Sequence, residues 1–138
     1  MDILINIDVD DLARAETFYT TAFELRVARR FGSHSVELLG GSSPMYLLVK
    51  PAGTPATVAG DTLRTYARHW TPVHADFVVT DMDLAVTRAL AAGAVQEREV
   101  TTHSWGKLAL MADPFGNGFC LVQFLGRGYD EIATEPRN

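Results

Sequence analysis

The sequence lacks the features that mark secreted and membrane proteins. Its 138 residues include one cysteine, Cys120, so no internal disulfide can form, which favours a reducing compartment. The longest apolar runs, such as residues 45–49 and 108–112, are far shorter than the roughly 20 residues that cross a bilayer. The residue after Met1 is the acidic Asp2, where a signal peptide would be basic. We therefore expect a cytoplasmic protein.

Basic residues are few and scattered. Lys and Arg number 12 against 17 Asp and Glu, which gives a formal net charge of −5. Without a basic cluster, the chain has no electrostatic footprint for nucleic acid or for an anionic membrane surface. Motifs for a serine nucleophile elbow, a phosphate-binding loop, a CxxC pair and an HExxH zinc helix are also absent. The expected partner is therefore a small molecule, with no nucleic acid and no membrane.

The first half of the chain carries the pattern of a strand, a helix and then three strands. Residues 3–9 alternate in polarity, which predicts a strand with one core-facing side. Asp10 or Asp11 can cap the next helix, whose apolar residues between 12 and 22 fall at helical spacing. Short strands are then predicted at residues 25–31, 34–39 and 45–50. This order makes one βαβββ module.

Residues 51–72 are predicted to connect two modules. Their first part is rich in Pro, Gly, Ala and Thr, which is typical of connectors. Asp61 can then cap a short helix that ends before Pro72 and carries an apolar stripe at i, i+3, i+4 and i+7. The stripe consists of Leu63, Tyr66, Ala67 and Trp70. We expect this helix to dock on the domain, with Tyr66 and Trp70 as packing residues rather than ligand contacts.

From Val73 on, the same order of elements returns. Alternating residues predict a strand, Asp81 can cap a helix over residues 82–92, and Gly93 can close that helix. Later strands are predicted at residues 95–102, 106–112 and 118–125, with a turn at 113–118 before the last strand. The tail, residues 127–138, is polar, and we expect it to be only partly ordered.

The two halves align as copies of one unit. A shift of 70 positions lays residues 7–11 over residues 77–81 and places Leu4 on His74. Near the module ends, Tyr46-Leu47-Leu48-Val49 matches Phe119-Cys120-Leu121-Val122. We therefore expect an α+β fold in which two tandem βαβββ modules form a curved mixed sheet around a ligand cup. The domain would span residues 1–126, with module one at 1–50, the connector at 51–72 and module two at 73–126.

Three segments carry a resemblance to a known superfamily. They are VDDLARAETFY at residues 9–19, HADFVVTDMDLAVTRALAAGA at residues 74–94 and DPFGNGFCLVQF at residues 113–124. Over nearly its whole length the chain resembles the vicinal oxygen chelate superfamily of glyoxalases, bleomycin resistance proteins and extradiol dioxygenases. The resemblance implies the paired βαβββ fold, but the superfamily contains both metal-dependent enzymes and metal-free drug-binding proteins. One departure is Glu24, where members usually carry Gly after the first helix.

The resemblance also implies where a metal would bind. Metal-dependent members place ligands at four positions that correspond here to Leu4, Leu47, His74 and Cys120. Leucine cannot ligate, and Cys120 stands where these enzymes usually carry Glu, so its thiolate would favour a softer metal. Two ligands are fewer than the three protein ligands of catalytic zinc. We therefore expect no metal cofactor. A divalent metal held by His74 and Cys120, with a helper such as Asp76, stays open as the alternative.

Strand alternation predicts which side chains line the cup. The predicted ligand-binding residues are Asn6, Leu47, His74, Asp76, His103, Trp105, Cys120, Val122 and Phe124. This set is mostly apolar with a few polar anchors, which is typical of small-molecule pockets. His74 and Asp76 could form an acid–base pair, although such neighbours sit roughly 7 Å apart at the backbone. In the simpler interpretation His74 is a hydrogen-bonded strand residue, Cys120 a small apolar side chain and Trp105 a hairpin residue.

Two functions are consistent with these features. The first is a metal-independent protein that binds a hydrophobic or aromatic small molecule, as bleomycin resistance proteins do. The second is an enzyme of the superfamily that acts on a small metabolite through His74. It would be a metal-dependent lyase, isomerase or dioxygenase, or a metal-free acid–base catalyst that uses His74 and Asp76. The missing ligands favour the first function. We expect a homodimer, and whether the modules close a cup within one chain or across two chains stays open.

Overall fold

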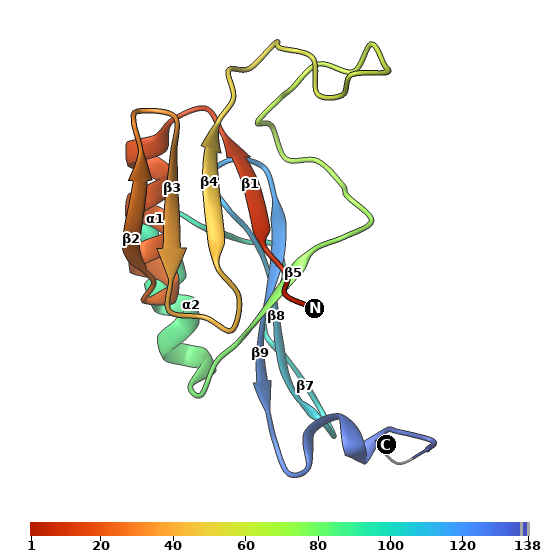
Figure 1. Cartoon of the computed structure of the whole chain (residues 1–138). Helices are drawn as coiled ribbons and strands as arrows, with labels where there is room; N and C mark the ends of the chain where they lie inside the picture. The colour runs from red at the N-terminus through yellow and green to blue at the C-terminus, as the bar shows by residue number, and fades with distance from the viewer. Residues whose placement is uncertain (136, 138) are drawn as a thin grey trace.

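Each half of the chain folds as a strand, a helix and a run of strands, as the repeat predicts (Figure 1). The structure is a computed structural model that describes residues 1–135 and residue 137. Module one contains β1 (Ile5–Val9), α1 (Leu12–Phe23), β2 (Arg26–Phe31), β3 (Ser35–Leu39) and β4 (Met45–Val49). Module two contains β5 (Ala75–Val78), α2 (Met82–Ala92), β6 (Val95–Gln96), β7 (Thr101–His103), β8 (Gly106–Ala112) and β9 (Gly118–Phe124).

Over the described residues, the strands form two mixed sheets. The order is β1-β4-β3-β2 in module one and β5-β9-β8-β6 in module two, where β7 also pairs with β8. In each sheet the first strand runs parallel to the last strand of its module, and the other pairs are antiparallel. β1 and β5 are therefore the edge strands of their sheets. The predicted α+β fold of two βαβββ modules is confirmed.

Aspartate caps fix where both helices begin. The Asp11 carboxylate accepts a hydrogen bond from the backbone N–H of Arg14 at 2.9 Å, and the Asp81 carboxylate accepts one from Leu84 at 3.0 Å. Each bond satisfies an N–H group that has no partner within its helix. Asp11 is therefore the residue that caps α1. None of the helices in the described part of the chain could span a bilayer.

α1 ends at a residue with an unusual backbone conformation. Glu24 has a φ of 55°, and among the described residues it is the only non-glycine residue with a positive φ. Gly93 ends α2 in the same left-handed region, which glycine adopts at little cost. The Glu24 carboxylate lies 2.5 Å from the guanidinium of Arg88 on α2. The departure from glycine at this turn thus places an acidic side chain where it pairs with module two.

Both helices and both sheets share one hydrophobic core. Phe18 of α1 packs edge-on against Phe119 of β9, with ring centroids 6.3 Å apart. Phe23 at the end of α1 stacks on Phe77 of β5, with centroids 3.7 Å apart. Fully buried residues come from both modules and include Val9, Val36, Leu38, Leu47, Met82, Met111, Phe115 and Leu121. The helix of module one therefore packs on strands of module two, and a common core joins the modules.

The predicted helix in the connector is wrong. Its backbone groups pair across the connector instead, as in the bond from the Arg64 N–H to the Thr54 carbonyl at 2.8 Å. The Tyr66 hydroxyl donates to the carbonyl of Lys50 at 2.5 Å, whereas Trp70 is 81% exposed. A short apolar stripe is a weak helix signal, because an isolated helix of this length is marginal and these backbone groups find partners elsewhere.

One prediction near the C-terminus needs correction. The strand predicted over residues 95–102 is two strands, β6 and β7, separated by a short irregular stretch. The polar tail contains a 3-10 helix, η1 (Gly128–Glu131), from which Tyr129 packs against Trp105 and Phe124. The ring centroids are 5.1 Å and 4.8 Å apart. Aromatic contacts that sequence polarity did not reveal therefore hold this part of the tail.

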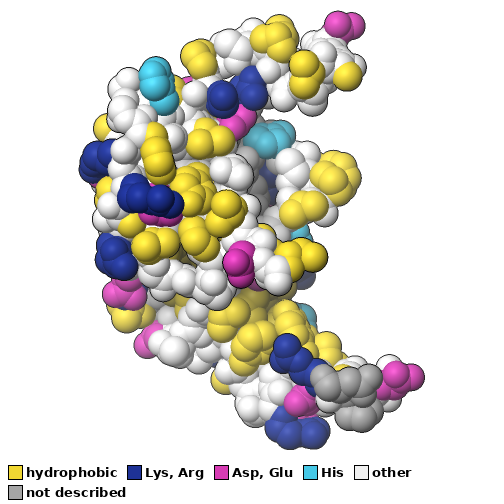
Figure 2. Space-filling view, viewed as in Figure 1, with side chains coloured by type: hydrophobic (Ala, Val, Ile, Leu, Met, Phe, Trp, Pro, Cys, Tyr) yellow, Lys and Arg dark blue, Asp and Glu magenta, His cyan; other side chains and the backbone are white. Residues whose placement is uncertain are grey.

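The connector and the C-terminal segment project from the body of the molecule. In Figure 1 the connector loops out from the end of β4 and returns to β5, while the C-terminal segment lies beyond the far end of β9. Figure 2 shows the surface hollowed between these two projections. The chain therefore presents an indented side that is framed by its least regular segments.

A buried carboxylate joins α1 to the last hairpin of module two. Asp113 is 4% exposed and accepts hydrogen bonds from the Tyr19 hydroxyl at 2.6 Å and from the backbone N–H of Phe115 at 2.8 Å. The backbone N–H and the side-chain amide of Asn117 each donate to it at 2.9 Å. Burial and the neighbouring carboxylate raise the pKa of Tyr19 well above its usual value, so the hydroxyl stays protonated. One side chain thus shapes the turn and binds the helix.

Removing the Tyr19 hydroxyl tests this link. In Tyr19→Phe the Asp113 carboxylate stays buried and loses a donor, so the free energy of unfolding in urea should fall by about 1.5–3 kcal/mol. Tyr66→Phe is the control, because the Tyr66 hydroxyl donates to a backbone carbonyl in an exposed position. Its loss should cost about 1 kcal/mol or less. Equal losses in the two variants would contradict a special role for the Asp113 contact.

Candidate functional site

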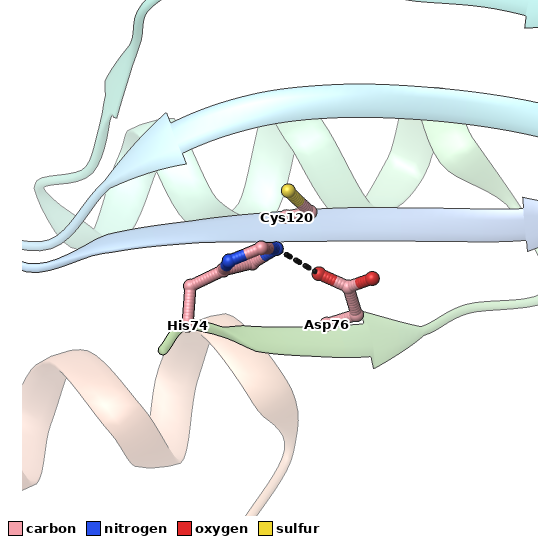
Figure 3. A group of neighbouring side chains, drawn as sticks. All are labelled: His74, Asp76 and Cys120. Carbon is pink, nitrogen blue, oxygen red and sulfur yellow. Dashed lines mark ion pairs between the residues drawn. The ribbon is translucent and has the colours of Figure 1, made fainter. Parts of the chain in front are cut away.

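Strand pairing brings three reactive side chains together (Figure 3). His74 directly precedes β5, and Asp76 within β5 pairs with Cys120 of β9 in the parallel register. Residues two apart on a strand share a face, so His74 lies beside the same pair. His74 Nε2 is 3.1 Å from Asp76 Oδ1, and the ligand atoms of all three residues lie within 4.8 Å of one another. His74 and Asp76 therefore make the contact that strand spacing alone left open.

The surroundings of Cys120 keep its thiol protonated. Cys120 is 7% exposed, and burial, followed by the Asp76 carboxylate, raises the pKa of the thiol from 9.0 to about 11. Activated cysteine nucleophiles instead have a cationic neighbour that lowers the thiol pKa. The arrangement is therefore not that of a cysteine nucleophile. Any proton transfer at this site would fall to His74, oriented by Asp76.

His74 and Cys120 line a pocket of about 210 Å³. The other lining residues are Arg68, Trp70, Thr71, Glu97, Leu110, Met111, Gly118 and Phe119. Apolar walls with a few polar groups are the usual make-up of a small-molecule site. Sequence reasoning missed Arg68, Trp70 and Glu97, because it predicted a docked helix in the connector and a regular strand after α2.

The connector reaches this pocket by crossing the last hairpin. A Cβ atom on Gly116 would overlap the carbonyl oxygen of Ala67, and one on Gly118 would lie 2.6 Å from the guanidinium of Arg68. The Arg68 guanidinium then pairs with the Glu97 carboxylate. Gly116 in the turn before β9 and Gly118 at the start of β9 are thus the sequence signal for this crossing, since glycines leave room for other groups to approach closely.

Module one does not mirror this site. Asn6 of β1 pairs with Tyr46 of β4, as Asp76 pairs with Cys120 in module two. Tyr46 is therefore the counterpart of Cys120, and the prediction that Leu47 lines the cup is wrong. Leu47 is completely buried in the core. The sequence overlay was one residue out because it matched apolar residues, and a slip of one residue moves a side chain to the other face of a sheet.

A charged network occupies the corresponding face of module one. The Arg29 guanidinium binds both carboxylate oxygens of Glu37, at 2.5 and 2.7 Å, and the Tyr46 hydroxyl donates to Glu37 at 2.7 Å. These hydrogen bonds lower the pKa of Glu37 to about 2. Figure 2 shows basic and acidic atoms among hydrophobic side chains on this side of the molecule. The buried Glu37 carboxylate is therefore engaged within module one.

The predicted aromatic wall lies toward the other end of the module two sheet. Trp105 stacks on His103, with centroids 5.1 Å apart and planes at 1°. Phe124 lies four residues beyond Cys120 on β9, and Val122 between them is 1% exposed. The predicted ligand-binding residues therefore fall into separate groups within one chain. The reactive group of His74, Asp76 and Cys120 is the one that the structure brings together.

A larger cavity of about 530 Å³ lies between the modules. Its walls come from the end of α1, the turn between β3 and β4, β5 and the start of α2, and they include Phe23 and Phe77. The ion pair of Glu24 and Arg88 also stands in this wall. Asp76 is the one predicted site residue that lines it. The cavity therefore follows β5, an edge strand of its sheet.

Comparisons with known proteins point to one fold. A family model described as a glyoxalase-like domain matches residues 4–122. An uncharacterised protein from Mycobacterium bovis is 30% identical over 118 residues, which cover 83% of this chain and 78% of the relative. The structure of TioX from Micromonospora sp. ML1 gives a TM-score of 0.67 at 21% identity, covering 91% of this chain and 99% of that chain. The structure of the fosfomycin resistance protein FosX from Listeria monocytogenes gives a TM-score of 0.66 at 17% identity. The match covers 89% of this chain and 92% of that chain.

The raised pKa of Cys120 predicts slow alkylation. Because the thiol is protonated below a pKa of about 11, iodoacetamide at pH 8 should modify native Cys120 about 100-fold more slowly than the urea-unfolded protein, whose thiol pKa returns towards 9.0. The native rate should rise about tenfold per pH unit up to pH 10, since the thiolate fraction does so. A native rate that levels off near pH 9 would contradict this assignment.

Proposed function

The chain belongs to the glyoxalase-like family of the vicinal oxygen chelate superfamily, and from this premise we propose that it binds a hydrophobic or aromatic small molecule without a metal. The pocket beside His74 and Cys120 carries this proposal. Leu110, Met111 and Phe119 supply apolar wall, while the half-exposed His74 offers a polar anchor. Apolar walls favour burial of the ligand, and a few polar groups orient it.

The placement of the donor groups supports a metal-free function. The superfamily resemblance places metal ligands in both modules, but the three clustered donors here all come from module two. His74 and Asp76 already pair with each other. In module one, Leu4 has no donor atom in its side chain, and Tyr46 donates to Glu37. The module one half of the expected ligand set is therefore missing.

One observation favours a second candidate, a metal-dependent enzyme. His74, Asp76 and Cys120 offer an imidazole, a carboxylate and a thiol within 4.8 Å of one another. Three protein ligands of these types fit a catalytic zinc site, which keeps a further position for water or substrate. A metal held there would supply a Lewis acid for a substrate oxygen. Without a metal, His74 held by Asp76 could instead serve as an acid–base catalyst.

Metal analysis separates the two candidates. Protein purified without chelator and offered Zn²⁺, Mn²⁺, Ni²⁺ and Fe²⁺ should hold far less than one ion per chain after desalting, as measured by mass spectrometry of the elements. His74→Ala should then leave the metal content unchanged, as should the control His34→Ala in the turn between β2 and β3. About one equivalent of metal that is lost in His74→Ala and kept in His34→Ala would overturn the metal-free proposal.

We further propose that the protein is a cytoplasmic homodimer. Among the described residues, β5 has a hydrogen-bonded neighbour on its β9 side only, and the larger cavity follows this strand. Open sheet edges pair readily with another chain unless they are protected. Val73 and Val78 beside this edge are 79% and 64% exposed, and a second copy would cover them. The single buried Cys120 suits a reducing compartment.

Light scattering after size exclusion tests the dimer. The wild type should elute with twice the 15.1 kDa mass of the chain. Val78→Glu should shift the protein to the monomer, because a charge on the β5 edge opposes its burial against a second copy. Val58→Glu is the control, since Val58 is fully exposed in the connector. A monomeric wild type, or equal effects of the two variants, would contradict the proposed interface.

A further inference from the structure

Trp70 is an exposed indole on a segment that is bonded to the last turn of module two. It is 81% exposed, although tryptophan is highly buried on average. One of its chain neighbours bonds to the last turn of module two, and the other bonds locally along the chain. The His69 N–H donates to the Gly116 carbonyl at 3.2 Å, and the Thr71 hydroxyl donates to the Val73 carbonyl at 2.6 Å. Trp70 therefore stands on a docked segment, and binding through its indole would not require ordering a free loop.

Arg68 adds an anchor on the pocket side of the same segment. Its guanidinium lies 3.1 Å from the Glu97 carboxylate, measured from Nη2 to Oε2, and it also donates to the His69 carbonyl. The side chain passes over Gly118 to reach the pocket. Because these N–H groups are engaged within the protein, Arg68 is a positioning residue. The indole of Trp70 is the group that the connector leaves available at the pocket rim.

The pocket beside Trp70 suits one small planar ring. Its volume of about 210 Å³ is below the about 300–1,000 Å³ of pockets that hold drug-sized ligands. His74 Nε2 lies 3.1 Å from the Asp76 carboxylate, so this ring nitrogen already has a partner within the protein. His74 Nδ1 is the other ring nitrogen, and an imidazole nitrogen can form a hydrogen bond with a hydroxyl group. The acidic Asp76 beside it favours a neutral ligand over an anion.

We propose that Trp70 is a ligand-binding residue that covers one face of a phenolic ring, while the ring hydroxyl forms a hydrogen bond with His74. This inference rests on the proposed small-molecule function, and it adds the chemical class of the ligand and the residue that selects it. Aromatic rings pair in stacked or edge-to-face geometries that a saturated ring cannot adopt. An indole at the pocket rim therefore discriminates a planar ring from a puckered one of similar size.

Phenol and cyclohexanol are matched probes, because both are six-membered rings with one hydroxyl and only phenol is planar. Each is titrated into the full-length protein, and binding is followed by the NMR chemical shifts of the protein. Trp70→Ala should weaken phenol binding about tenfold and cyclohexanol binding far less. Trp105→Ala is the matched control, because it removes the other indole, which packs against His103 and Tyr129 away from this pocket. Trp105→Ala should lower the melting temperature and leave phenol affinity unchanged. Trp70→Ala should weaken phenol binding and leave the melting temperature unchanged.

A second pair of variants tests the position of the indole. Gly116→Ala inserts a Cβ atom where the connector crosses, so it should displace Trp70 and weaken phenol binding as much as Trp70→Ala. Gly53→Ala is its control, because Gly53 also has a positive φ of 78° but has open space around it. Gly53→Ala therefore introduces comparable backbone strain without displacing the connector, and it should leave phenol affinity unchanged.

Several outcomes would overturn the inference. They are unchanged phenol affinity in Trp70→Ala, equal losses in Trp70→Ala and Trp105→Ala, and absence of saturable phenol binding to the wild type. Phenol binding that survives Trp70→Ala but is lost in His74→Ala would overturn only the role of Trp70 and would support the proposed function. The proposed function itself fails if a broad screen of aromatic and aliphatic compounds finds none that shifts the His74 resonances.

Discussion

The buried carboxylate of Asp113 is the contact on which both the core and the pocket depend. Through Tyr19 it holds α1 against module two, and through Phe115 and Asn117 it shapes the turn that leads into β9. The same turn supports the connector, since Gly116 accepts a hydrogen bond from His69. A buried carboxylate that lacks donors is costly, so the turn and the helix stabilise each other through Asp113. One acidic side chain thus links module one, the connector and the strand that carries Cys120.

The elements of the two modules could be predicted from sequence because their signals are local. Asp11 and Asp81 each stand directly before their helices and bond to N–H groups three residues later. Alternation identified the strands, and the repeat showed that the pattern occurs twice. The connector is different. Tyr66 and Trp70 have helical spacing, yet the backbone of this segment bonds across the connector and to a hairpin far along the chain. Local periodicity carries no information about these distant hydrogen-bond partners.

The candidate site was predictable to the extent that strand geometry determined it. His74 and Asp76 share a face because they are two residues apart, and the family resemblance placed Cys120 beside them. Leu47 failed because the overlay of β4 on β9 was one residue out, which only the strand register reveals. Trp70 and Arg68 could not be assigned, because their roles depend on where the connector crosses module two. The available sequence signal for this crossing was the pair Gly116 and Gly118, because glycines leave space for another segment.

The crossing of the connector over the last turn also sets an order of maturation. During synthesis the connector emerges well before the residues at 113–118 on which it rests. Domains tend to fold as units, and the two modules share one core, so the fold can be completed only after these residues have emerged. Trp70 has no support until the final hairpin has left the ribosome. The proposed ligand site would therefore be completed last, because both Cys120 and the support for Trp70 come from the final hairpin.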